Sequence, residues 1–191
     1  MTVLAVLVAL AAAVAATGCA AAWLLPSGPG RDAGTLAMVL GTAVLGLVAA
    51  VPGAVPDSED VLAWLVPVVL APVAVLGGGP VTAGVLHLAD REDAGQVEKA
   101  AAVLRGGAWI GVFERTGVFA ALVAGWPEGI AVVLGLKGLG RYSELKAEGA
   151  RSESAPALTG GVAERFIIGT FCSVLWAAGC AGALAGLLPS G

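Results

Sequence analysis

Long apolar runs separated by short polar stretches make up most of this chain. A helix needs about 20 apolar residues to cross a bilayer, and all but one of the runs reach that length. The runs cover residues 3–25, 34–55, 61–88, 103–124, 127–139 and 162–188. The pattern therefore predicts an all-α fold, a single transmembrane domain over residues 1–191 with about six membrane-spanning helices.

The third run, residues 61–88, carries signals against a regular helix. Pro67 and Pro72 lie inside it, and the stretch from Gly77 to Pro80 is three glycines followed by a proline. A proline inside a helix removes one backbone hydrogen bond and clashes with the preceding turn. We therefore expect this helix to be kinked or broken. If it crosses the bilayer twice or re-enters, the orientation of everything before it is inverted.

Lysine and arginine residues set the predicted orientation. The loops after the second and fourth runs carry only carboxylates, whereas the basic loop residues follow the first, third and fifth runs. These basic residues are Arg31; Arg91, Lys99 and Arg105; and Arg141, Lys146 and Arg151. The positive-inside rule places the basic loops in the cytoplasm and both termini outside. The first run lacks the basic start of a signal peptide, so we expect it to remain as a helix.

Composition agrees with a membrane protein. The chain is 58% hydrophobic and 13% charged, and its mean hydropathy is +0.93. Soluble domains average about 45–50% apolar and about 25% charged residues. No basic tract indicates a nucleic-acid partner.

The chain offers few residues for metal or nucleophilic chemistry. Cys19, Cys172 and Cys180 all lie in apolar runs, where we expect them to be small core residues, and His87 is the only histidine. One histidine with scattered cysteines does not make the usual zinc set. We therefore assign no catalytic residue, metal site or cofactor.

Two Glu-Arg pairs lie in strongly apolar surroundings, Glu114-Arg115 and Glu164-Arg165. An ionisable side chain at the centre of a membrane helix costs about 2.5–3.5 kcal/mol on insertion scales. Adjacent helical residues point about 100° apart, so each charge needs a partner on another helix. The fifth run offers two basic residues four apart on one face. The predicted cluster is Glu114, Arg115, Lys137, Arg141, Glu164 and Arg165, with a formal charge of +2.

Two interpretations of this cluster remain open. A positive pocket facing the cytoplasm would suit a phosphate, a lipid headgroup or a carboxylate. Alternatively, the charges reach the membrane interface or pair only to hold helices together. The first interpretation favours a small transporter or a membrane-binding subunit for an anionic solute or lipid.

The second interpretation favours a structural subunit that docks a membrane partner protein or another copy of the chain. A third hypothesis is an enzyme acting on a phosphorylated or isoprenoid lipid, with Glu114 or Glu164 as the base. The spans contain no Asp-rich metal motif, which argues against that chemistry.

The part from about Gly111 to Ala178 resembles a small bacterial family of integral-membrane proteins known as a domain of unknown function. The matching residues are Glu114-Arg115, Gly129-Ile130, Lys137, Arg141, Tyr142, Glu144, Glu164, Ile168-Gly169-Thr170 and Ser173. Gly138 departs from the pattern, where the family has serine, and the first half of the chain does not match. The resemblance implies a multi-pass protein of the bacterial cytoplasmic membrane and supplies no activity.

Overall fold

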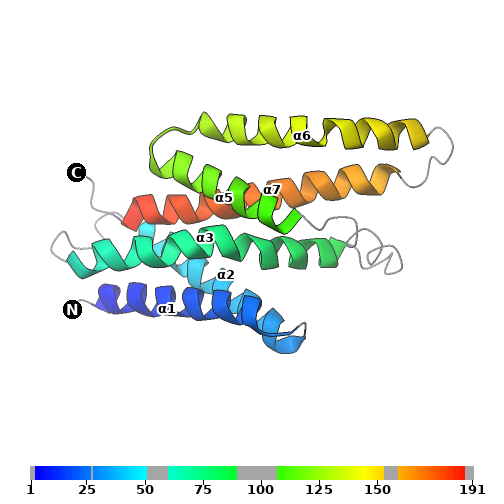
Figure 1. Ribbon diagram of the computed structural model, residues 1–191. Helices are drawn as coiled ribbons and strands as arrows, with labels where there is room; N and C mark the ends of the chain where they lie inside the picture. Colours follow the sequence, from blue (N-terminus) through cyan, green and yellow to red (C-terminus); the bar gives the residue numbers. More distant parts are fainter. Residues whose placement is uncertain (1–2, 27, 51–59, 90–106, 153–158, 188–191) are drawn as a thin grey trace.

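The computed structural model describes residues 3–26, 28–50, 60–89, 107–152 and 159–187. Helices account for nearly all of this part, and no strand occurs within it, so the predicted all-α fold is confirmed. The helices are α1 (Val3–Leu24), α2 (Pro29–Ala49), α3 (Asp60–Ala89), α5 (Gly107–Val123), α6 (Gly129–Ser152) and α7 (Thr159–Leu187), as Figure 1 shows.

Four of these helices are long and apolar enough to cross a membrane. The candidate spans are Val6–Leu24, Pro29–Ala49, Val66–Leu88 and Arg165–Leu187, and Gly129–Gly140 is a shorter apolar segment in α6. The chain is therefore a membrane-embedded helix bundle, while the expected total of six spans stays a prediction.

The bounds of α2 and α6 differ most from those that the apolar runs predict. α2 begins at Pro29, so Arg31 lies in its first turn instead of in a loop. Proline suits the first turn because the amide hydrogen that it lacks has no partner there. α6 continues to Ser152, well past the predicted end at residue 139. Eight of the 13 added residues are Ala, Arg, Glu, Leu or Lys, which favour helix although the segment as a whole is polar.

α3 lies at the centre of the bundle and contacts α1, α2, α5 and α7. It is one α-helix from Asp60 to Ala89, with Pro67, Pro72 and Pro80 inside it. The chain thus stays helical through all three prolines, and the expected kink remains a prediction.

Small residues let α1 and α2 pack closely. A side chain added at Gly18 would meet the backbone oxygen of Gly34 and the backbone nitrogen of Met38 at 2.6 Å. One added at Gly41 would meet the Ala11 oxygen at 2.8 Å. Without a hydrophobic force between helices in lipid, such close backbone contact is a main source of helix association.

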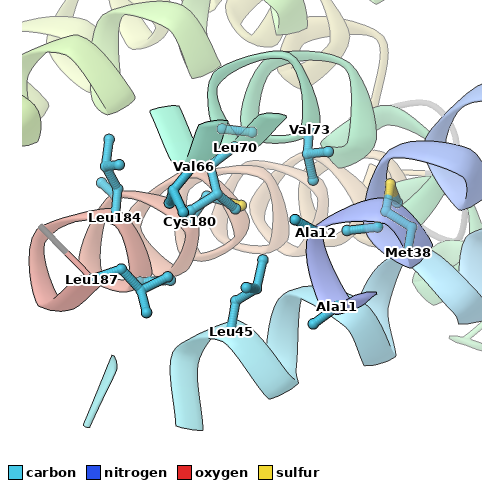
Figure 2. Close-up of a cluster of buried hydrophobic side chains, with 14 of the residues drawn as sticks. Ala11, Ala12, Met38, Leu45, Val66, Leu70, Val73, Cys180, Leu184 and Leu187 are labelled. Carbon is cyan, nitrogen blue, oxygen red and sulfur yellow. The ribbon is translucent and has the colours of Figure 1, made fainter. Parts of the chain in front are cut away.

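Figure 2 shows the apolar core where α1, α2, α3 and α7 meet. Met38, Leu45 and Leu70 are fully buried there, together with Cys180. The three cysteines are free, and Cys19 also belongs to this core. The core joins α1, α2, α3 and α7, with Phe119 of α5 also part of it, and no described residue of α6 belongs to it.

α5 and α6 form an antiparallel hairpin closed by a glycine turn. Gly125 has φ +70, its N–H donates to the Leu122 carbonyl, and the Trp126 N–H donates to the Ala121 carbonyl. These two bonds and the left-handed glycine make a Schellman motif that ends α5. Beyond the turn, Gly117 of α5 packs against Val133 of α6. This register brings residues near 114 on α5 opposite residues near 137 on α6.

The close packing of α1 on α2 predicts different results for two glycines of the same helix. Gly41→Ala should lower the free energy of unfolding by about 1–3 kcal/mol, because the new methyl group overlaps the α1 backbone. Gly46 has nothing within 4 Å of an added side chain. Gly46→Ala should be neutral or stabilising by up to about 1 kcal/mol, since alanine is the better helix former. Denaturant titration in detergent micelles measures both, and equal effects would contradict the packing described.

Candidate functional site

Arg115 of α5 is the most deeply buried charged side chain in the described part of the molecule, with 5% of its surface exposed. Its Nε donates a hydrogen bond to the Val75 carbonyl of α3 at 2.6 Å. Its Nη1 donates to the Ser173 hydroxyl of α7 at 3.2 Å. One guanidinium therefore joins three helices, and both of its acceptors are uncharged.

Glycines leave the space that the Arg115 side chain occupies. A side chain added at Gly78 of α3 would collide with Cδ of Arg115, and one added at Gly111 of α5 would lie 3.0 Å from its Nη1. A larger residue at Gly78 would therefore displace the guanidinium. The Gly77 to Pro80 stretch is helical and does not break α3, and its glycine at 78 provides room for an arginine.

The same turn of α3 receives two indole donors. Pro80 has no amide hydrogen, so the Leu76 carbonyl has no donor from its own helix four residues on. Trp23 of α1 supplies one, with its Nε1 at 3.0 Å from that oxygen. Trp176 of α7 donates to the Val73 carbonyl, also at 3.0 Å. Side chains from α1, α5 and α7 thus converge on neighbouring carbonyls of α3.

The α3 and α7 members of this convergence lie at the middle of their candidate spans, whereas Trp23 lies near the end of Val6–Leu24. Gly77 is the middle residue of Val66–Leu88, and Trp176 is the middle residue of Arg165–Leu187. Arg115 bonds to Val75 and Ser173, which lie within three residues of these two midpoints.

Glu114 points to a different helix from its neighbour Arg115. Its Oε2 accepts a hydrogen bond from Lys137 Nζ of α6 at 2.5 Å, and the two side chains are 12% and 16% exposed. Lys137 Nζ also lies 5.4 Å from the ring centroid of Phe166 of α7. Among the described helices, α6 contacts only α5 and α7. Lys137 interacts with both of them, through Glu114 of α5 and Phe166 of α7.

The charges at this site do not cancel. Within the described ranges, no carboxylate lies at salt-bridge distance from Arg115, and Glu114 forms its salt bridge with Lys137. Arg115, Lys137 and Glu114 together carry a formal charge of +1. Since low dielectric strengthens the field of a buried charge, an anion would be drawn to Arg115.

The structure describes four of the six predicted cluster residues in detail. Glu114 and Lys137 are paired, Arg115 turns toward α3 and α7, and Arg165 is partly buried on α7. The side chains of Arg141 and Glu164 lie outside the described part. Sequence reasoning missed Trp23, Trp176 and Ser173 as members of the site.

Of these missed residues, only Ser173 carried a sequence signal, through the family resemblance. Trp23 could have been sought as an indole donor for the Leu76 carbonyl that Pro80 leaves free, although nothing in its own position pointed to that bond. Trp176 bonds to the Val73 carbonyl, which Pro80 does not affect.

Comparison with protein-family models, with curated proteins and with solved structures finds no match to this chain. The resemblance described above therefore stays an expectation, and the site is interpreted from its own geometry.

The Glu114–Lys137 pair predicts a clear difference between two glutamates. Glu114→Gln should lower the free energy of unfolding by about 1–3 kcal/mol, because Lys137 keeps its charge without a partner in a partly buried place. Glu128→Gln is the control, since Glu128 is exposed in the turn between α5 and α6 and should change stability by less than about 0.5 kcal/mol. Adding Lys137→Met to Glu114→Gln should recover part of the loss. Thermal unfolding in detergent measures all three, and matching values for the two single variants would remove the role of the pair.

Proposed function

We propose that this protein binds an anionic group at Arg115 and serves as a small transporter or as a membrane-embedded binding subunit. The observation that carries the proposal is a buried guanidinium, near the middle of the candidate spans of α3 and α7, whose acceptors, the Val75 carbonyl and the Ser173 hydroxyl, are both neutral. A charge in that position is expensive, and such residues usually mark a substrate or ion pathway.

The unused hydrogen-bond donors of Arg115 indicate the chemistry of the ligand. A guanidinium has five N–H donors in a planar fork, and the bonds to Val75 and Ser173 use one on Nε and one on Nη1. The second donor of Nη1 and both donors of Nη2 remain. Adjacent donors of this kind fit the two oxygens of a carboxylate or a phosphate. The ligand class is therefore an oxyanion, carried by a solute or by a lipid.

The position of the site favours transport over docking. Transporter sites commonly lie near the bilayer midplane. α3 is a continuous helix at this level, and its glycine at 78 makes room for the Arg115 side chain. We extend the proposal to six spans in the bacterial cytoplasmic membrane, with both termini outside and the site reached from the cytoplasm, as the loop charges favour.

A structural subunit is the second candidate, and one observation favours it. Arg115 and Lys137 each join three helices, so the same charges would also hold a bundle together without any ligand. In that case removing either charge would weaken the fold, and added anions would have no effect on it.

Thermal unfolding in nanodiscs distinguishes these candidates. Wild-type protein in phosphatidylcholine nanodiscs should gain stability from inorganic phosphate or citrate, by about 2.7 kcal/mol at 100 times the dissociation constant. Nanodiscs that contain phosphatidylglycerol, without added anions, test a lipid source for the same group. Arg115→Gln should abolish the gain, whereas Ser173→Ala keeps the guanidinium and should retain most of it.

Two results would contradict anion binding at this residue. One is an undiminished gain in the Arg115→Gln variant. The other is no gain from any anion in wild-type protein, together with a lower melting temperature for Arg115→Lys. The second result would move the assignment to a structural subunit.

A further inference from the structure

One face of α7 lies against a backbone carbonyl and polar or charged residues of other helices. The residues concerned are three or four apart, so they lie on one side of the helix. In order toward the beginning of α7 they are Trp176 at the Val73 carbonyl, Ser173 at Arg115, Gly169 at Thr82 and Phe166 at Lys137. From Ser173 to Phe166 this face covers roughly 10 Å along the helix axis. It leads from mid-membrane toward the end of α7 that we propose to be cytoplasmic.

Two buried oxygen atoms beside this face have no hydrogen-bond partner in the part of the chain that the structure describes. They are Oγ1 of Thr82 on α3 and Oε1 of Glu114 on α5. Thr82 contributes its methyl group to the contact at Gly169, and Glu114 is linked to Phe166 through Lys137. Nearly all buried polar groups in proteins pair with protein or with ordered water. Lipid tails supply no such partner.

We infer that water reaches Arg115 along this face of α7, between α3, α5 and α6, and that this hydrated path is the route by which a small oxyanion enters from the cytoplasm. The presence of water is inferred from the unpartnered oxygens of Thr82 and Glu114. The claim that an oxyanion uses the path rests on the proposed function. Water along the path completes the hydrogen bonding of both oxygens.

The opposite face of α7 has a different character. Ile167, Phe171 and Leu175 are exposed there by 53%, 64% and 67%, and each is four residues from the next. This apolar stripe is suited to lipid contact. The two faces of one helix thus differ at the same depth, which provides an internal control.

The charges along the path select for anions. Arg115 lies at its inner end, and Lys137 stands nearer the beginning of α7 with Glu114 as its partner. The formal charge of these three groups is +1, so a negatively charged probe should enter faster than a positive one.

Cysteine labelling tests the path. In a background with Cys19, Cys172 and Cys180 changed to alanine, single variants Gly169→Cys and Thr82→Cys are exposed to charged methanethiosulfonates in inside-out vesicles. Gly169 is a suitable position because a Cβ atom added there lies 3.6 Å from the Thr82 methyl group and 3.9 Å from Leu86, which is ordinary contact. Phe171→Cys is the matched control on the lipid-facing side. Thiols react as thiolates, which need water, so both path variants should label at least about 10-fold faster than the control.

The outcomes separate the path from the binding site. Labelling at Gly169→Cys that is faster with the anionic than with the cationic reagent, and slowed by inorganic phosphate, supports both. Fast labelling that phosphate does not slow supports hydration and contradicts the phosphate site. Labelling no faster than at Phe171→Cys overturns the path, even if phosphate still stabilises the protein.

Thr82→Val gives a second test that does not depend on the cysteine background. If water bonds to the Thr82 hydroxyl, replacing it with a methyl group should lower the melting temperature. If the hydroxyl is buried without any partner, the same change removes an unsatisfied group and should raise the melting temperature. A rise would contradict hydration at this level.

Discussion

The carbonyl oxygen of Leu76 lies in the middle of a membrane-embedded helix and has no donor in that helix. Pro80 removes the amide hydrogen that would normally bond to it, and a bilayer offers no water in exchange. Trp23 on α1 donates to this oxygen, and Arg115 on α5 and Trp176 on α7 donate to the nearby carbonyls of Val75 and Val73. The relative positions of four helices are thereby set at one level. The buried arginine, and with it the proposed anion site, lies at the same level of α3.

The glycines near this turn act together with the proline. Gly78 and Gly111 leave room for the Arg115 side chain, and Gly77 lies against Met38 and Trp176. A sequence with larger residues at these positions could still form the same helices, but it could not bring an arginine against the α3 backbone. The arrangement also explains why adjacent Glu114 and Arg115 have separate roles. Their side chains diverge on α5, so one reaches α6 and the other reaches α3 and α7.

The sequence predicts the helices better than it predicts the site. Apolar runs locate α1, α3 and α7 closely because lipid requires long, uncharged helices. They fail for α6, whose polar second half is helical by intrinsic propensity, which hydropathy does not measure. Charge in an apolar setting points to Glu114 and Arg115. It cannot show that a tryptophan 53 residues before Leu76 supplies the missing donor, because that bond depends on how α1 and α3 pack.

A double-mutant cycle between Trp23 and Pro80 tests most directly whether the free carbonyl of Leu76 organises the bundle. Trp23→Phe keeps an aromatic ring and removes the donor, and Pro80→Ala restores the backbone amide that can bond to Leu76 within α3. The account predicts that Trp23→Phe costs about 1 kcal/mol or more in the wild-type background and clearly less in the Pro80→Ala background. Equal costs in the two backgrounds, measured by reversible unfolding in the same detergent, would contradict it.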